Sequence, residues 1–338
     1  MSANVALAGQ GERGLAQAKK SSDQRLIRTC SIWRALEVVG DTSTLLVLEA
    51  IWWGARRFDQ IQSRSGLQKA LISDRLKKMI EADILFKRSY MDKPPRFEYL
   101  LTQKGQDLYW TSLMLLRWER KWSSQRSRLK TELTHHSCGK IINPEPLCGH
   151  CQQVVHPTDV SWQEGPGVGL MAPLYSRRRQ RRSSGESERE QSSLFTEAAE
   201  LMGDRWSSLI LRSVFTHLRK FDEIMKDTAI ASNILSERLA WLTDIGVLTT
   251  VLYQTNPDRF EYWLTKKGLD YYPILVMLQQ WGDKYYASPE GPPVILFHKS
   301  CGHALHPYVG CSNCAEPLKP AEVDFQILSR KSARAAAT

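Results

Sequence analysis

Residues 66–85 read GLQKALISDRLKKMIEADIL, and residues 229–248 read AIASNILSERLAWLTDIGVL. In both stretches apolar residues recur at helical spacing, which predicts a helix with one buried side and one polar side. The polar side of the first stretch carries Lys69, Ser73 and Lys77, which follow one another at steps of four. Each helix is expected to lead through a turn into a strand.

A charged hairpin is predicted directly after the first of these helices. Two short strands meet at the proline-containing tip YMDKPPRFE, residues 90–98, and LLTQKG then begins another helix. Helices followed by a polar-sided helix and a hairpin are typical of a winged helix-turn-helix. In that fold the polar-sided helix enters the major groove and the hairpin contacts the DNA backbone. An α+β, mainly helical fold is therefore expected.

The other predicted helices fit this order. Apolar spacing predicts a helix at 26–39 that ends at Gly40, and a buried helix at 42–53 that ends at Gly54. A short helix should begin at Arg57. Thr102 is a plausible cap for a long helix that extends to about residue 128.

Composition limits the class of protein. A chain of 338 residues has room for two or three domains, and its net charge of +10 suits a polyanionic partner such as nucleic acid. The seven cysteines do not resemble a secreted disulfide framework, and no apolar stretch reaches the length of a membrane span. These features predict a protein of the reducing cytoplasm that does not enter a membrane.

One sequence offset relates the two halves of the chain. The pairs Gly40 and Gly203, Phe58 and Phe221, Leu76 and Leu239, Tyr99 and Tyr262, and Trp118 and Trp281 are all separated by 163 positions. Chance matches would not keep one offset through helices, loops and hairpin. We infer a tandem duplication that covers roughly residues 30–155 and 193–318.

The repeated residues resemble the HxlR-type winged-helix transcription regulators, a family close to the MarR-type regulators. The resemblance lies in C-x4-AL-x3-GD, which begins at Cys30, then RF-x2-I, S-x-RL and RFEY-x-LT-x-KG. It implies DNA binding as a two-fold dimer. This chain differs by carrying two domains, and its first copy reads GDTS at 40–43 where the second reads the more family-like GDRW at 203–206.

A repeated metal-binding pattern follows each long helix. The ligand candidates are His135, Cys138, Cys148, Cys151, His298, Cys301, Cys311 and Cys314. Each copy contains H-x2-C followed by C-x2-C, and such pairs suit a tetrahedral Zn²⁺ ion. We expect one structural Zn²⁺ in a zinc-ribbon-like module of each copy. Reduced structural cysteines, or one redox disulfide per copy, are the alternatives.

Cys30 stands apart from these motifs. The resemblance implies a redox- or electrophile-responsive cysteine at this place in the first helix, whereas Ser193 occupies the equivalent position in the second copy. Burial as a small apolar side chain is the commoner role of a single cysteine. Cys30 is therefore a possible sensor. If Cys30→Ser left the release of DNA by diamide unchanged, this interpretation would be removed.

The predicted organisation has seven parts. They are a disordered tail at 1–24, a winged helix at 25–130, a zinc-ribbon-like module at 131–158, a flexible basic linker at 159–192, a second winged helix at 193–288, a second module at 289–319 and a tail at 320–338. The linker contains five arginines among residues 177–182, which could contact phosphates.

The predicted DNA contacts lie on the two polar-sided helices and on the hairpins. They are Gln68, Lys69, Ser73, Arg75, Lys77, Lys93 and Arg96 in the first copy, and Ser232, Asn233, Ser236, Arg238 and Arg259 in the second. Because the first copy supplies the lysines, we expect it to contribute more of the electrostatic attraction. The half-sites should differ and lie about one helical turn apart.

The sequence thus predicts a cytoplasmic, nucleoid-associated bacterial regulator that binds double-stranded DNA, most simply as a repressor. A homodimer could form through the long helices that carry Trp118, Trp122 and Trp281. The alternative is a protein-interaction or architectural adaptor in which the second winged helix and the modules mediate dimerisation. An enzyme is not expected, because the chain lacks a phosphate-binding glycine loop and a nucleophile motif.

Overall fold

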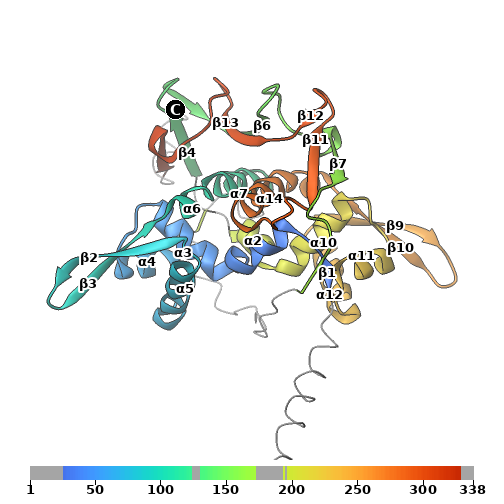
Figure 1. The fold of residues 1–338 in the computed structure, drawn as a ribbon, viewed down its shortest axis with the longest axis horizontal. Helices are drawn as coiled ribbons and strands as arrows, with labels where there is room; N and C mark the ends of the chain where they lie inside the picture. The colour runs from blue at the N-terminus through green and yellow to red at the C-terminus, as the bar shows by residue number, and fades with distance from the viewer. Residues whose placement is uncertain (1–25, 124–129, 173–192, 195, 329–338) are drawn as a thin grey trace, which may run out of the picture.

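The computed structural model describes residues 26–123, 130–172, 193–194 and 196–328. Two winged helices lie side by side, with their hairpins at opposite ends of the molecule (Figure 1). Between them lie the central helices α7 (Tyr109–Trp122) and α14 (Tyr272–Tyr286), and short strands gather above these two helices. No helix in the described ranges is both long and apolar enough to cross a membrane.

The two copies contain the same elements in the same order. The first consists of α2 (Ser31–Val39), α3 (Thr42–Trp52), α4 (Phe58–Ser65), α5 (Lys69–Glu81), β2 (Leu85–Asp92), β3 (Pro95–Leu101), α6 (Gln103–Gln106) and α7. The second consists of α9 (Thr196–Gly203), α10 (Arg205–Phe215), α11 (Phe221–Thr228), α12 (Ser232–Asp244), β9 (Leu248–Gln254), β10 (Arg259–Leu264), α13 (Lys266–Leu269) and α14. The predicted winged-helix order is confirmed.

The first helix begins later than predicted. Cys30 has an extended backbone with φ −151°, and its sulfur accepts a hydrogen bond from the Trp33 amide at 3.4 Å, so the residue caps α2 instead of continuing it. The preceding residues form the strand β1 (Ile27–Arg28), which pairs with β8 (Leu170–Met171).

The long helix predicted from Thr102 is divided into α6 and α7. Thr102 caps α6 as expected, because its hydroxyl accepts a hydrogen bond from the Gly105 amide at 3.2 Å. Gly105 lies so close to the end of α5 and the start of β2 that an added Cβ would be 2.3 Å from the carbonyl oxygen of Ile84. This close approach requires glycine and fixes where the wing joins the rest of the domain.

The copies exchange their first helices. α2 packs against α10 and α14 of the second copy, whereas α9 packs against α3 and α7 of the first. The Arg34 guanidinium donates to the carbonyl of Tyr286 at 2.7 Å, and the Glu119 carboxylate accepts from the amide of Ala198 at 2.8 Å. A single hydrophobic core extends through both copies as a result.

The tryptophans predicted for a homodimer are used inside this chain. The indole nitrogen of Trp118 donates to the carbonyl of Lys267 at 3.0 Å, and that of Trp281 donates to the carbonyl of Lys104 at 2.9 Å. Trp122 donates to the Asp270 carboxylate at 2.8 Å. These side chains therefore join one copy to the other, and a homodimer through them stays a prediction.

The strands above the central helices also combine the two copies. One sheet contains β14 (Val323–Leu328), β4 (Lys130–His135) and β5 (Lys140–Ile142), and another contains β12 (His303–Ala304), β11 (Val294–His298) and β7 (Val160–Glu164). β6 (Pro144–Cys148) pairs with β13 (Pro307–Cys311). The two modules predicted at 131–158 and 289–319 are therefore intertwined.

Two segments predicted to be loose are partly ordered. β7 and β8 lie within the predicted linker, and β14 lies within the predicted final tail. Each gains order from strand pairing, because β7 hydrogen-bonds with β11 and β14 with β4. The predicted tail at 1–24, the arginine-rich segment at 177–182 and residues 329–338 lie outside the described residues.

Two buried carboxyl groups lie where α9 meets the first copy. Glu49 accepts hydrogen bonds from the Ser193 hydroxyl at 2.8 Å and the Leu194 amide at 2.5 Å. Burial raises the pKa of Glu49 to about 7, and burial likewise raises the pKa of Glu119 to about 7. Both groups thus hold a proton in the folded chain at pH values where the unfolded chain has released it.

This arrangement predicts that stability falls as pH rises. Below the unfolded pKa of 4.5 the stabilisation by the protonated carboxyls is fully present, and it is lost as pH rises through about 7. For each group the loss should not exceed about 3 kcal/mol. Urea unfolding between pH 5 and pH 8 measures this loss. The variant Glu49→Gln should show a smaller change in the free energy of unfolding over the same pH range.

Glu290 is exposed and provides a control. Glu290→Gln should leave the pH dependence of unfolding as in the unsubstituted chain. A stability that rises between pH 5 and pH 8, or a Glu49→Gln variant with an unchanged profile, would contradict the assignment.

Candidate nucleic-acid interface and metal centres

The helices α5 and α12 lie at the edge of the molecule opposite the short strands β6 and β13 (Figure 1). Their buried sides pack on their own domains through Ile72, Leu76 and Met79 in α5 and Leu235, Leu239 and Leu242 in α12. The opposite sides leave most of the predicted DNA contacts exposed: Gln68, Lys69, Ser73, Lys77, Ser232, Asn233 and Ser236. These side chains are accessible to a ligand as large as a DNA duplex.

The two predicted arginines on these helices are placed differently. The Arg75 Nε atom lies 3.0 Å from the Asp41 carboxylate, and the Arg238 Nε atom lies 2.5 Å from the equivalent Asp204 carboxylate. Asp41 and Asp204 also cap α3 and α10. Each arginine therefore attaches its polar-sided helix to the start of the second helix, and contact of either with DNA stays a prediction.

The hairpins place basic side chains at both ends of the molecule. The predicted contacts Lys93, Arg96 and Arg259 are exposed near the hairpin tips. Sequence reasoning missed Lys87, which is also exposed on β2 and lies 4.8 Å from the ring centre of Phe97. The strand alternation could not have identified it, because that pattern places Lys87 on the same face of the hairpin as the buried Leu85.

The metal-ligand candidates form two compact groups, but the grouping differs from the prediction. His135 and Cys138 of the first copy come together with Cys311 and Cys314 of the second. Cys148 and Cys151 of the first copy come together with His298 and Cys301 of the second. Each group thus combines H-x2-C from one copy with C-x2-C from the other.

Strand pairing explains this exchange. β6 and β13 pair so that Pro144 lies opposite Cys311 and Cys148 lies opposite Pro307. Each C-x2-C pair begins at the last residue of one of these strands. The strand pairing therefore places it beside the H-x2-C pair of the other copy. The spacing of the motifs could not predict this exchange of ligands. Both copies contain the same two pairs at the same separation, so either H-x2-C pair could combine with either C-x2-C pair.

The distances within each group fit a tetrahedral metal. In the first, the His135 Nδ1 atom lies 3.7 Å from the Cys138 sulfur and 3.4 Å from the Cys314 sulfur, and the Cys138 and Cys311 sulfurs are 3.8 Å apart. Zn–S and Zn–N bonds of about 2.3 and 2.0 Å place tetrahedral ligands roughly 3.5–3.8 Å apart. Sulfurs at this separation are not joined by a disulfide bond, so each group could hold a metal ion.

The second group has the same geometry. The His298 Nδ1 atom lies 3.3 Å from the Cys151 sulfur and 3.5 Å from the Cys301 sulfur. Beside it the exposed imidazoles of His150 and His303 stack with their ring centres 3.4 Å apart. The equivalent positions at the first group are Asn313 and Lys140, so the surroundings of the two groups differ. Sequence reasoning missed this pair because the two histidines are far apart in the chain.

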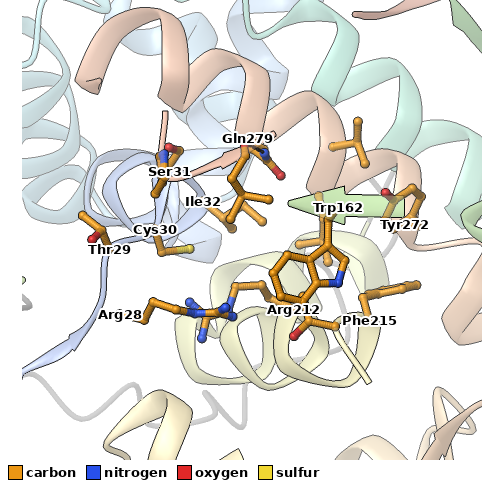
Figure 2. Close-up of a pocket in the computed structure, with 15 residues that line it drawn as sticks. Arg28, Thr29, Cys30, Ser31, Ile32, Trp162, Arg212, Phe215, Tyr272 and Gln279 are labelled. Carbon is orange, nitrogen blue, oxygen red and sulfur yellow. Dashed lines mark hydrogen bonds between the residues drawn. The ribbon is translucent and has the colours of Figure 1, made fainter. Parts of the chain in front are cut away.

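Cys30 lies in the wall of a pocket and is only 5% exposed (Figure 2). The pocket has a volume of about 70 Å³ and lies where α2, α10, α14 and β7 meet. The sulfur points toward the guanidinium of Arg212, which pairs with Asp227. Cys30 is thus accessible through this pocket and not from an open surface.

The arrangement defines a protein with two winged helices in one polypeptide. Residues 38–127 and 201–290 each match the family described as HxlR-like helix-turn-helix. Since these ranges cover more than half of the chain, it belongs to the HxlR-like helix-turn-helix family as a tandem duplication. Its relatives are named as transcription regulators, and the chain is accordingly not an enzyme.

Several known proteins are similar to parts of the chain. An uncharacterised HTH-type transcriptional regulator of Mycobacterium bovis is 41% identical over 121 residues, which are 36% of this chain and 77% of the relative. One from Methanothermobacter thermautotrophicus is 33% identical over 90 residues, or 26% and 69% of the two chains. The solved structure of PA1607, a candidate transcription factor, is 33% identical with a TM-score of 0.34 and covers 40% of this chain and 94% of its own.

The ion pair between Arg75 and Asp41 generates a stability prediction. Arg75→Gln should lower the free energy of unfolding by about 1–3 kcal/mol, because the Asp41 carboxylate would lose its charged partner while 19% exposed. Lys77 is 77% exposed, so Lys77→Gln should change stability by less than about 0.5 kcal/mol. Urea unfolding compares the two variants, and equal losses would contradict the role given to Arg75.

Proposed function

We propose that this chain is a sequence-specific, double-stranded DNA-binding transcription regulator whose two winged helices act together as a pseudo-dimer. The observation that carries the proposal is the placement of α5 and α12 on one edge of the molecule with polar, exposed outer sides (Figure 1). A pair of recognition helices on one face suits two half-sites of one duplex. The net charge of +10 supports the same partner.

The exchanged helices support the pseudo-dimer. Because α2 and α9 each pack on the other copy, the winged helices are joined through a common core instead of by a free linker. A fixed separation of α5 and α12 favours operators with one half-site spacing. Occlusion of a promoter is the simplest outcome of such binding, so we propose a repressor that acts in the cytoplasm on the nucleoid.

We also propose that each His–Cys group binds a structural Zn²⁺ ion. Three sulfurs and one imidazole nitrogen at tetrahedral separations favour zinc over harder cations. Four protein ligands would fill the coordination shell, so the ion would support the fold. Each ion would join the first copy to the second, because two of its ligands come from the first copy and two from the second.

Matched double variants test the metal proposal. Cys138→Ala with Cys311→Ala removes two ligands from one group, whereas Cys138→Ala with Cys148→Ala removes one ligand from each group. The first variant should retain one of two zinc ions per chain, and the second should retain neither. Metal content is measured by mass spectrometry after dialysis against a mild chelator.

The reverse result would support ligand sets confined to one copy. An unsubstituted chain without zinc would remove the metal proposal and leave the winged helices unaffected. Both variants lose two thiols, so general damage from cysteine removal affects them alike.

Equivalent positions on α5 and α12 test DNA binding. Lys69 of the first copy corresponds to Ser232 of the second. Lys69→Ala should weaken binding and lower the slope of log affinity against log salt by about one, since one phosphate contact is lost. Ser232→Ala should leave this slope unchanged. Gel-shift titrations at two salt concentrations on the DNA upstream of the gene, with scrambled duplex beside it, provide the measurement.

A bipartite footprint with a large preference for the upstream DNA is the expected result. Equal, salt-sensitive binding to both duplexes would contradict sequence-specific regulation and favour the architectural role.

A further inference from the structure

The pocket beside Cys30 has a counterpart filled by side chains in the other half of the molecule. Trp162 and Thr216 line the pocket, and their equivalents 163 positions away are Phe325 and Trp53. Trp53 and Phe325 pack with ring centres 5.5 Å apart. The smaller Thr216 side chain cannot fill the space beside Trp162 in this way, so the pocket results from a difference between the copies.

The pocket also contains a buried, incompletely paired charge. Arg212 is only 8% exposed, and within the described residues its Nε and Nη1 atoms have no hydrogen-bond partner. Arg28 and Arg212 share the single carboxylate of Asp227. The Arg28 side chain is 22% exposed and can be hydrated, whereas the buried Arg212 has only this shared carboxylate as a counter-ion.

This charge is specific to one side of the molecule. The residue equivalent to Arg212 is Glu49, whose carboxyl binds Ser193 and Leu194. The remaining walls of the Arg212 pocket are mostly apolar and include Ile32, Leu275 and Val276. Figure 2 shows the guanidiniums of Arg28 and Arg212 near the indole of Trp162.

We propose that this pocket binds a small organic monoanion with an apolar body, a short-chain or aromatic carboxylate. Its carboxylate would bind the free edge of the Arg212 guanidinium, and its apolar body would lie against Trp162 and Val276. A volume of about 70 Å³ is roughly half that of a cavity that encloses benzene, so part of the apolar body of an acid such as isovalerate would lie in the mouth of the pocket.

The position of the site connects the ligand to DNA binding. Asp227, the partner of Arg212, lies in α11, and α12 begins five residues later. A carboxylate on the free edge of Arg212 shares the guanidinium with Asp227, and it would thereby change one attachment of α11 to the core. This regulatory step rests on the proposed DNA-binding function, whereas occupancy of the pocket does not.

Calorimetry with isovalerate and benzoate tests occupancy, and the neutral amides of both acids provide matched controls. The acids should bind saturably, with one site per chain and at least tenfold more tightly than their amides. Arg212→Gln should remove this preference. Lys226→Gln deletes the same charge from an exposed position on α11 and should preserve it.

A second variant covers the case in which Arg212→Gln does not fold. Thr216→Trp introduces the residue found at the equivalent position 53 and should fill the pocket, so that binding of both acids is lost in a folded chain. Cys30→Ser should retain binding, because the guanidinium and not the thiol holds the anion.

Equal affinities for acids and amides, no saturable binding at 10 mM, or unchanged binding in Thr216→Trp would overturn the proposal. Gel shifts with and without isovalerate then examine regulation. If isovalerate binds but does not change the affinity of the chain for DNA, the regulatory step is contradicted and only the binding site remains. If the chain does not bind DNA at all, the proposed function is contradicted, but the calorimetric result on the pocket still holds.

Discussion

The reciprocal packing of α2 and α9 is the constraint on which the rest of the molecule depends. Each first helix leaves its own copy and completes the core of the other. Glu119 accepts from the amides at the start of α9, and Arg34 donates to the end of α14, so hydrogen bonds fix both helices at the exchange. Because the partners share one polypeptide, their association does not depend on protein concentration, unlike that of a separate dimer. The spacing of α5 and α12 follows from this packing.

Much of the winged-helix fold could be predicted because local signals and the repeat agree. The cap Thr102 and the offset of 163 residues located the elements in both copies. The exchange of metal ligands could not be predicted, since identical spacings in both copies allow two pairings, and only the register of β6 with β13 distinguishes them. A signal for the strands β7 and β14 was present, however. Pro157 and Pro320 keep the same offset, and each begins the short turn that precedes its strand.

Two pairs of equivalent positions near the exchanged segments differ strongly between the copies. Glu49 and Arg212 occupy equivalent places, yet one is a carboxyl that burial keeps protonated near neutral pH and the other is a guanidinium bound to Asp227. Trp53 and Thr216 differ in volume, which removes the pocket on one side and opens it on the other. The duplicated fold therefore tolerates opposite charges and different volumes in its interior. A pair of identical chains could not acquire this asymmetry by substitution.

The crossed ligand groups have a consequence for synthesis of the chain. A ribosome that has translated the first copy has released His135, Cys138, Cys148 and Cys151, but their partners in the crossed groups lie between 147 and 179 positions further on. Until Cys301 emerges, neither group can be completed, although the four available side chains already include one H-x2-C and one C-x2-C pair. The nascent protein thus passes through an interval in which a metal ion can be captured within one copy. Native assembly then requires that this early pairing be exchanged for the crossed one.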